Sequence, residues 1–307
     1  MDKVQDVGEE PVLLGAAVPN SAASPPPPAV ARDLGVVAGP PRPLPKGWPV
    51  KTVTPLWTWL GTQRAPVTVV VTSAGGGVGT STVAALLAET FAAGAPSGAS
   101  TVLLDQCGTP WGPVSRRVLG QRGGLSGRTA AALLQQGVHP LRVLRGAPVS
   151  PAGAAVVVED GEASPLRDMR RLVQTVCGGL VVDAGCINPW VVQRVADPAA
   201  ARPVLVLVGR ADVPGAETVC ASLAWLRRSL PGPPIVVLVS TAPPERGQVA
   251  AAQRLVRTVV PADRVVHLPF DARLAHGQDI RLDKVGKTTA MAVPQLLRAI
   301  RLVQEGR

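Results

Sequence analysis

Short apolar runs alternate with longer amphipathic stretches from Val67 to the end of the chain. Each run is rich in Val and Leu and shows little alternation of apolar and polar positions. This pattern is typical of strands that are buried on both faces of a parallel sheet. We expect seven such strands: Val67–Ser73, Thr101–Asp105, Ala154–Asp160, Gly179–Gly185, Pro203–Gly209, Pro234–Ser240 and Arg264–Phe270.

The amphipathic stretches between these runs predict the helices Ser81–Ala93, Thr129–Gln136, Leu166–Cys177, Ala216–Leu230, Gln248–Val259 and Ala290–Gln304. Regular alternation of strand and helix predicts a doubly wound α/β fold, with a mostly parallel sheet flanked by helices. Ligands of such folds bind beyond the carboxyl ends of the strands, so functional residues are expected at those strand ends.

The first 65 residues differ from the rest in composition. Residues 11–66 carry 13 of the 32 prolines, and proline at this density blocks helices and sheet ladders. We therefore expect residues 1–65 to form a Pro-rich, mostly disordered arm, and residues 66–307 to form the folded domain. The stretch Val50–Gly61 holds Trp57 and Trp59, which are costly to expose. We expect it to dock, either over an edge of the same domain or as an anchor for a partner or a membrane.

The net charge and the cysteine pattern limit the possible functions of the protein without assigning one. The formal net charge of +10 permits nucleic acid or an anionic membrane as partner, but the arginines are spread along the chain. Four cysteines form no C-x-x-C pair and only three histidines exist, which argues against zinc. The start of the chain is acidic, and no apolar stretch of membrane-spanning length occurs, so we expect a cytoplasmic protein.

The segment Ser73–Thr82, SAGGGVGTST, follows the first predicted strand and opens the first predicted helix. Its glycines let backbone N–H groups turn towards an anion, and the helix N-terminus adds partial positive charge. Strand, glycine loop and helix in this order predict a phosphate-binding loop. Its phosphate-binding residues would be Gly76, Gly77, Val78, Gly79, Thr80, Ser81 and Thr82. The hydroxyl of Ser81 suits Mg²⁺.

These motifs resemble the ParA/MinD family of P-loop ATPases, whose deviant Walker A loop has the form S-G-K-G-G-V-G-K-T-T. The strand ending at Asp105 is similar to the family's second strand, and GLVVDAG with Asp183 is similar to its Walker B strand. Ser240 falls where the family bears a residue near the adenine, and HLPFDARLAHG resembles the family's I-P-x-D segment. The resemblance implies a P-loop NTPase fold, ATP and Mg²⁺ as cofactors, and Ser81, Asp105 and Asp183 as the metal site.

Three departures from the family pattern affect the reaction. The signature lysine, which in the family reaches across a nucleotide-sandwich dimer, falls on Gly75, and the phosphate-gripping lysine falls on Thr80. The second carboxylate of the family's Asp-x-Asp pair, linked there to the attacking water, falls on Cys107. Phosphoryl transfer is catalysed mainly by positioning and charge neutralisation. We therefore assign no catalytic residue and expect little or no hydrolysis.

Other basic residues offer substitutes. Arg116, Arg117 and Arg210 follow predicted strands on the ligand side, and each would either face a phosphate or lie solvated at the surface. The Gly-Lys-Thr within Leu282–Thr289 is no Walker A loop, because Arg281 stands where that loop needs glycine. The basic, amphipathic last helix would either close the domain core or contact a membrane.

We expect a degenerate ParA/MinD-like protein that acts as a positioning or assembly factor, binds a protein partner, and binds nucleotide weakly or not at all. A homodimer is compatible with this expectation. Two alternatives stay open. The first is an active ATPase that partitions DNA or cargo with an arginine in place of the lysines. The second is a basic nucleic-acid-binding protein that needs no nucleotide.

Overall fold

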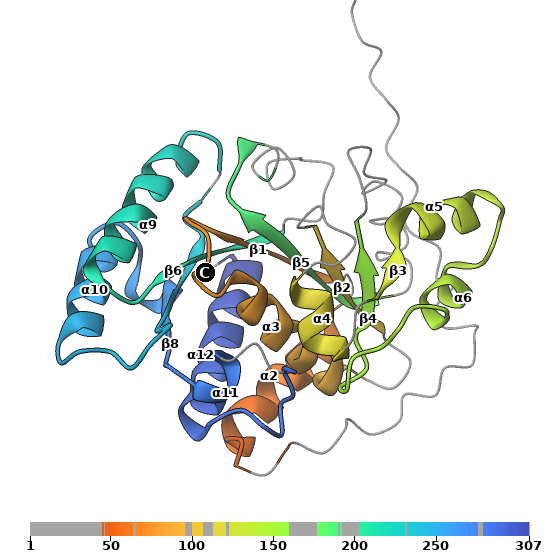
Figure 1. Ribbon diagram of the computed structural model, residues 1–307, viewed down its shortest axis with the longest axis horizontal. Coiled ribbons are helices and arrows are strands. Elements are labelled where there is room, and N and C mark those ends of the chain that lie inside the picture. Colours follow the sequence, from red (N-terminus) through yellow and green to blue (C-terminus); the bar gives the residue numbers. More distant parts are fainter. Residues whose placement is uncertain are drawn as a thin grey trace, which may run out of the picture.

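All strands that the structure describes belong to one parallel sheet (Figure 1). The computed structural model describes residues 45, 47–63, 66–95, 100–106, 113–120, 123–159, 177–189, 191, 203–230, 232–275 and 279–306. The strands in order across the sheet are β3 (Leu125–Ser126), β4 (Ala155–Val158), β2 (Ser100–Asp105), β5 (Cys177–Cys186), β1 (Val67–Ser73), β6 (Val204–Arg210), β7 (Ile235–Val239) and β8 (Val265–Leu268).

Helices cover both faces of this sheet, as expected for a doubly wound fold (Figure 1). One face carries α2 (Val50–Thr62), α3 (Thr80–Gly94), α4 (Pro113–Leu119), α11 (Ala272–Ala275) and α12 (Lys287–Gln304). The other face carries α5 (Gly127–Gln135), α6 (Pro140–Arg145), α9 (Val213–Leu226) and α10 (Gln248–Arg257). A short 3₁₀ helix, Ala262–Arg264, precedes β8.

The central strand β1 explains why the predicted strands lack alternation. Every residue of β1 is buried. Val69 pairs with Val181 of β5 on one side and with Val204 of β6 on the other. Val69 and Val71 pack towards α3 and α12, whereas Val70 packs towards the opposite layer. Both faces of the strand therefore require apolar side chains.

The predicted doubly wound sheet is confirmed, with differences at its margins. All seven predicted strands are present, and the structure adds the two-residue strand β3 at one edge. Five of the six predicted helices are present, with ends shifted by a few residues. The sixth falls on residues 166–176, which lie outside the described residues, and Cys177 belongs to β5 instead. The helices α2, α4 and α6 were not predicted, whereas α11 falls in the segment HLPFDARLAHG, which resembles the family's I-P-x-D segment and the helix that follows it.

The tryptophan-bearing stretch docks on the same domain. It forms α2, which packs against α3 and α12 with Trp57 and Trp59 buried in the core beneath the sheet. Just before α2, the indole Nε1 of Trp48 donates a hydrogen bond to the backbone oxygen of Leu282 at 2.9 Å. Of the two alternatives, the structure favours cover for the domain. The expected disordered arm otherwise falls on residues 1–44, outside the described residues.

The last helix, α12, also belongs to the core. Leu296, Leu297 and Ile300 are buried against α2 and β8. Its apolar stripe is therefore occupied within the domain, which favours core closure over membrane contact. No helix in the described part of the chain is both long and apolar enough to span a membrane.

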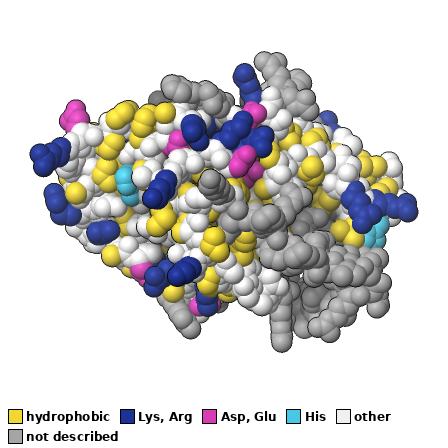
Figure 2. Space-filling view, turned by 90° about the horizontal axis from the view of Figure 1, so that it is seen from below, with side chains coloured by type: hydrophobic (Ala, Val, Ile, Leu, Met, Phe, Trp, Pro, Cys, Tyr) yellow, Lys and Arg dark blue, Asp and Glu magenta, His cyan; other side chains and the backbone are white. Residues whose placement is uncertain are grey.

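Basic side chains do not gather into one field on the face that Figure 2 shows. Lys and Arg lie there in several separate groups, with Asp and Glu among them. On this face, the described residues form no continuous stripe of positive charge of the kind that nucleic-acid binding uses.

The contact between α2 and α3 yields a stability prediction. A Cβ atom added at Gly94, the last residue of α3, would lie 2.2 Å from Cδ1 of Trp57. We expect Trp57→Ala to lower the free energy of unfolding by about 3–5 kcal/mol. Gly94→Ala should cost about 1–3 kcal/mol by overpacking in the wild-type chain, and nearly nothing once Trp57→Ala has removed the ring. Urea unfolding of the two single variants and the double variant measures this coupling.

The control for this cycle is Trp225→Ala on α9, because Trp225 is 39% exposed. This change should cost no more than about 1 kcal/mol. Equal losses for Trp57→Ala and Trp225→Ala, or additive effects of Trp57→Ala and Gly94→Ala, would contradict the packing of α2 described above.

Candidate functional site

The loop between β1 and α3 is held by backbone hydrogen bonds at the sheet edge. Ser73 accepts a hydrogen bond from the backbone N–H of Ile187 at 2.8 Å, and the N–H of Ala74 donates to Val208 at 3.0 Å. The hydroxyl of Thr72 donates to the backbone oxygen of Gly185 at 3.0 Å. These bonds fix the loop to the ends of β5 and β6, where a parallel sheet exposes its ligand-binding edge.

Two glycines of the loop are required by its backbone. Gly77 has φ of 71°, and Gly79, which caps the start of α3, has φ of 97°. Residues with a side chain rarely adopt these angles. At Gly79 an added Cβ would also lie 3.1 Å from Cγ1 of Val239 on β7. At Gly75 an added Cβ would meet no heavy atom within 4 Å and φ is not positive, so neither sterics nor backbone demands glycine there.

A cavity of about 530 Å³ opens above this loop. Its walls come from the loop, the ends of β5, β7 and β8, and the short helices α4 and α11. This volume lies within the usual range for a small-molecule site. Most of the lining residues are Gly, Ser and Thr, and Val239, Leu268, Pro269 and Leu274 add an apolar part.

The structure brings most of the predicted binding residues to this cavity. The predicted residues that line it are Gly76, Gly77, Gly79, Thr80, Ser81, Thr82 and Ser240. Val78 instead is buried in the hydrophobic core. Gly75 and Thr80, the positions of the two family lysines, both line the cavity. Cys107 lies outside the described residues.

The two predicted metal-site carboxylates are neighbours beside the cavity. Asp105 of β2 and Asp183 of β5 are paired in register, and both are fully buried. Asp105 Oδ2 accepts from the backbone N–H of Ser115 at 3.4 Å, and Asp183 Oδ1 accepts from that of Gly185 at 3.2 Å. Neither carboxylate lines the cavity itself, whereas Ser81 does.

At the opposite wall, Ser240 is engaged by a histidine that the sequence did not single out. The Ser240 hydroxyl and Nε2 of His267 lie 2.9 Å apart, linking the ends of β7 and β8. Burial lowers the pKa of His267 from its ordinary value, which favours the neutral ring at neutral pH. The serine at the family's adenine position is thus held by a neighbouring strand.

Asp271 occupies the start of the helix that carries the Gly-Lys-Thr sequence. Its Oδ2 accepts from the backbone N–H of Gly286 at 2.6 Å and from the hydroxyl of Thr289 at 2.9 Å. The N-terminus of α12, where Lys287 begins the helix, is therefore already occupied by a carboxylate. Asp271 also lines the cavity.

The three candidate arginines differ in their exposure and in whether they line the cavity. Arg116 is exposed on α4. Arg210, the last residue of β6, is exposed and pairs with Asp212, the residue that caps α9. Arg117 alone of the three lines the cavity, where burial lowers the pKa of its guanidinium from the ordinary value. The sequence could nominate these residues by topology, but only the direction of each side chain from its helix or strand separates them.

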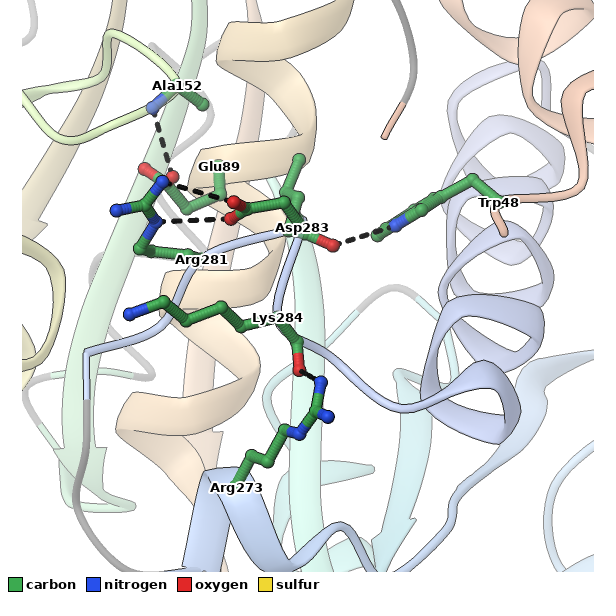
Figure 3. Close-up of polar contacts among 8 residues, drawn as sticks. Trp48, Glu89, Ala152, Arg273, Arg281, Asp283 and Lys284 are labelled. Atoms are coloured by element: carbon green, nitrogen blue, oxygen red, sulfur yellow. Dashed lines mark hydrogen bonds and ion pairs between the residues drawn. The ribbon is translucent and has the colours of Figure 1, made fainter. Parts of the chain in front are cut away.

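An irregular segment, residues 279–286, contacts α11 (Figure 3) and α4, two helices whose residues line the cavity. Arg273 of α11 donates from Nη1 to the backbone oxygen of Lys284 at 2.6 Å. Arg281 and Asp283 of this segment form an ion pair at 3.1 Å. At the segment's start, the N–H of Ile280 donates to the backbone oxygen of Arg117 at 2.7 Å. The segment therefore ties α11 to α4.

No family model and no curated protein matches the sequence. Among solved structures, the MinC:MinD cell division protein complex of Aquifex aeolicus is 15% identical, and the match covers 77% of this chain and 96% of that one, with a TM-score of 0.51. This chain has a ParA/MinD-like P-loop fold. The order of strands and the glycine loop between β1 and α3 agree with that assignment.

Two further structures match with lower scores. The MinD cell division protein of Aquifex aeolicus and a ParA family ATPase of Chlorobium tepidum are each 15% identical, with TM-scores of 0.47. The matches cover 77% and 75% of this chain and 97% and 99% of theirs. The assignment of a ParA/MinD-like fold rests on the first structure, and at this identity it concerns the fold alone.

The ParA/MinD-like loop yields a prediction that separates its glycines. Gly79→Ala should lower the free energy of unfolding by about 1–3 kcal/mol, because it forces a side chain into the left-handed region and against Val239. Gly75→Ala should change it by no more than about 0.5 kcal/mol, because that position is open. Urea unfolding of both variants is the measurement. Equal destabilisation at Gly75 and Gly79 would contradict the loop conformation described here.

Proposed function

We propose that this protein is a degenerate ParA/MinD-like positioning or assembly factor. It binds the phosphates of a nucleotide in the cavity and hydrolyses the nucleotide slowly or not at all. The observation that carries the proposal is the cavity itself. It keeps the glycine loop and the helix N-terminus, while Gly75 and Thr80 stand at its wall in place of the two family lysines. A backbone cradle of this kind binds phosphate without any lysine.

The same substitutions account for the proposed loss of turnover. A group that stabilises developing charge in a transition state is typically worth about a hundredfold or more in rate. Gly75 has no side chain, and Thr80 carries no positive charge. Cys107 replaces the carboxylate that the family resemblance links to the attacking water. Because such groups act together, their joint loss should leave hydrolysis near background.

ATP and Mg²⁺ are the proposed ligands, since Ser81, Asp105 and Asp183 offer the hard oxygen donors that Mg²⁺ prefers. The hydroxyl residue Ser81 lines the cavity and would hold the ion directly. The two carboxylates, buried side by side at the ends of β2 and β5, would balance its charge. When bound, the ion would neutralise phosphate charge.

A protein partner fits this proposal better than nucleic acid. The MinC:MinD structure, with the highest TM-score of the three structures described above, is a cell division protein complex. By analogy, we propose that this chain acts by binding another protein, and a homodimer remains compatible with that role. The separate groups of basic side chains in Figure 2 supply no such support for nucleic acid.

One observation favours a second candidate, an active partitioning ATPase. Arg117 lines the cavity and carries the positive charge that Gly75 and Thr80 lack. If that charge stabilised the transition state, turnover would survive. Measured hydrolysis therefore decides between the two candidates.

We expect wild-type protein to release phosphate from Mg-ATP no faster than the Ser81→Ala variant, in a coupled phosphate assay. The triple variant Gly75→Lys, Thr80→Lys, Cys107→Asp should gain nucleotide affinity more readily than turnover. Gly75 has the open space that its added side chain needs. Rapid hydrolysis by the wild-type chain that Ser81→Ala abolishes would reject the degenerate assignment and favour the ATPase.

Self-association, where it occurs, should not depend on ATP. The family resemblance implies that the signature lysine bridges two subunits through the nucleotide, and Gly75 removes that bridge. Sedimentation equilibrium with and without Mg-ATP should give the same mass for the wild-type chain. Gly75→Lys is the matched variant, because it restores the bridging charge alone. A wild-type chain that dimerises only with ATP would contradict the prediction.

A further inference from the structure

Arg117 projects from α4 into the wall of the cavity. Its Nη1 donates to the hydroxyl of Thr82, in the first turn of α3, and its Nη2 donates to the backbone oxygen of Leu274 on α11. The guanidinium therefore bridges the phosphate loop's helix and the short helix across the cavity. These two contacts distinguish Arg117 from an arginine whose side chain lies in solvent.

The guanidinium has more donors than its neighbours satisfy. An arginine carries five N–H donors and no acceptor. Its Nε is buried and has no hydrogen-bond partner among the described residues. No carboxylate in the described part of the chain forms an ion pair with it. A half-buried charge without a counterion is costly, and burial accordingly lowers the pKa of Arg117.

The charge balance of the cavity favours an anion. Among the described residues, Arg117 and Asp271 are the charged side chains that line it. The Asp271 carboxylate is already balanced, because it accepts from Gly286 and Thr289 at the positive end of α12. The positive charge of Arg117 has no such balance. Together with the N-terminus of α3, it places positive charge in the lining at this end of the cavity, whereas the buried carboxylates Asp105 and Asp183 lie outside the lining.

We propose that Arg117 is a phosphate-binding residue of this protein, which supplies from α4 the cationic contact that the loop positions Gly75 and Thr80 no longer supply. Its ligand is a phosphate oxyanion of a nucleoside diphosphate or triphosphate. This proposal rests on the proposed function, because it assigns a residue to the same cavity. Arginine suits the role, since its planar fork offers paired donors to phosphate oxygens.

The test compares two neighbouring arginines that carry the same charge. Binding of Mg-ADP, of pyrophosphate and of adenosine is measured by isothermal titration calorimetry for the wild type, Arg117→Gln, Arg117→Lys and Arg116→Gln. Arg116 is exposed on the same helix, so its substitution removes the same net charge without reaching the cavity. Pyrophosphate separates a free phosphate ligand from a nucleotide, and adenosine reports the cavity without phosphate.

We expect Arg117→Gln to weaken Mg-ADP and pyrophosphate by about tenfold to a hundredfold, the usual effect of losing a charged hydrogen bond. Arg117→Lys should recover part of this loss, because it restores charge without the fork. Arg116→Gln should bind like the wild type, and adenosine binding should change little in any variant. Pyrophosphate binding as strong as that of Mg-ADP would identify phosphate alone as the ligand.

Each contrary result has a distinct meaning. A wild-type chain that binds neither Mg-ADP nor pyrophosphate would overturn the proposed function and this inference together. Equal losses in Arg117→Gln and Arg116→Gln, or an equal loss for adenosine, would overturn the inference alone, because they indicate general charge or a structural defect.

A measurement on the wild-type chain avoids the risk that Arg117 variants misfold. The Nε–H resonance of Arg117 can be followed by ¹H–¹⁵N NMR and assigned by its absence from the Arg117→Lys spectrum. Pyrophosphate should shift this resonance in proportion to the fraction bound. A resonance that stays unchanged at saturating pyrophosphate would reject Arg117 as a phosphate contact.

Discussion

The parallel pairing of β1 with β5 and β6 is the constraint on which the site depends. Because all three strands run in the same direction, their carboxyl ends meet at one edge of the sheet. The N–H groups of Ala74 and Ile187 then join the loop to its neighbours there. The chain has to turn sharply from β1 into α3, and Gly77 and Gly79 supply the backbone angles for that turn.

A phosphate cradle built in this way tolerates changes that a reaction does not. Its donors are backbone N–H groups and the start of α3, which any sequence with the right glycines retains. The side chains that neutralise charge during phosphoryl transfer are separate from the cradle. Under the proposed function, Gly75 and Thr80 stand where the family pattern has lysines, while the glycines still supply the backbone turn. Arg117 returns a positive charge to the cavity wall, but this charge comes from α4 and not from the loop.

The sequence predicted the parts that depend on local pattern. Val67–Ser73 was predicted with the ends that β1 has, because a strand buried on both faces has a distinctive composition. The helices α4 and α6, with 7 and 6 residues, are too short to show a helical period. Arg116 and Arg117 are chemically identical neighbours, so only their directions from α4 separate the exposed residue from the cavity residue.

Contacts between segments that are far apart in the sequence could not be predicted from local pattern. Segment 279–286 shows why. It has no regular secondary structure, so its backbone groups need partners elsewhere in the domain. The Trp48 indole binds Leu282, and the Arg273 side chain binds Lys284 (Figure 3). Asp271 receives the N–H of Gly286 where α12 begins.

These partners come from the segment before α2, from α11 and from the loop after β8, and no local pattern links them. Each such bond contributes only about 1 kcal/mol on its own. Together they join α2 and α11 into one packed unit. The tryptophan-rich stretch, which the predicted domain boundary after residue 65 leaves outside the folded domain, is therefore structurally connected to α11, the cavity-lining helix that carries Arg117's partner Leu274.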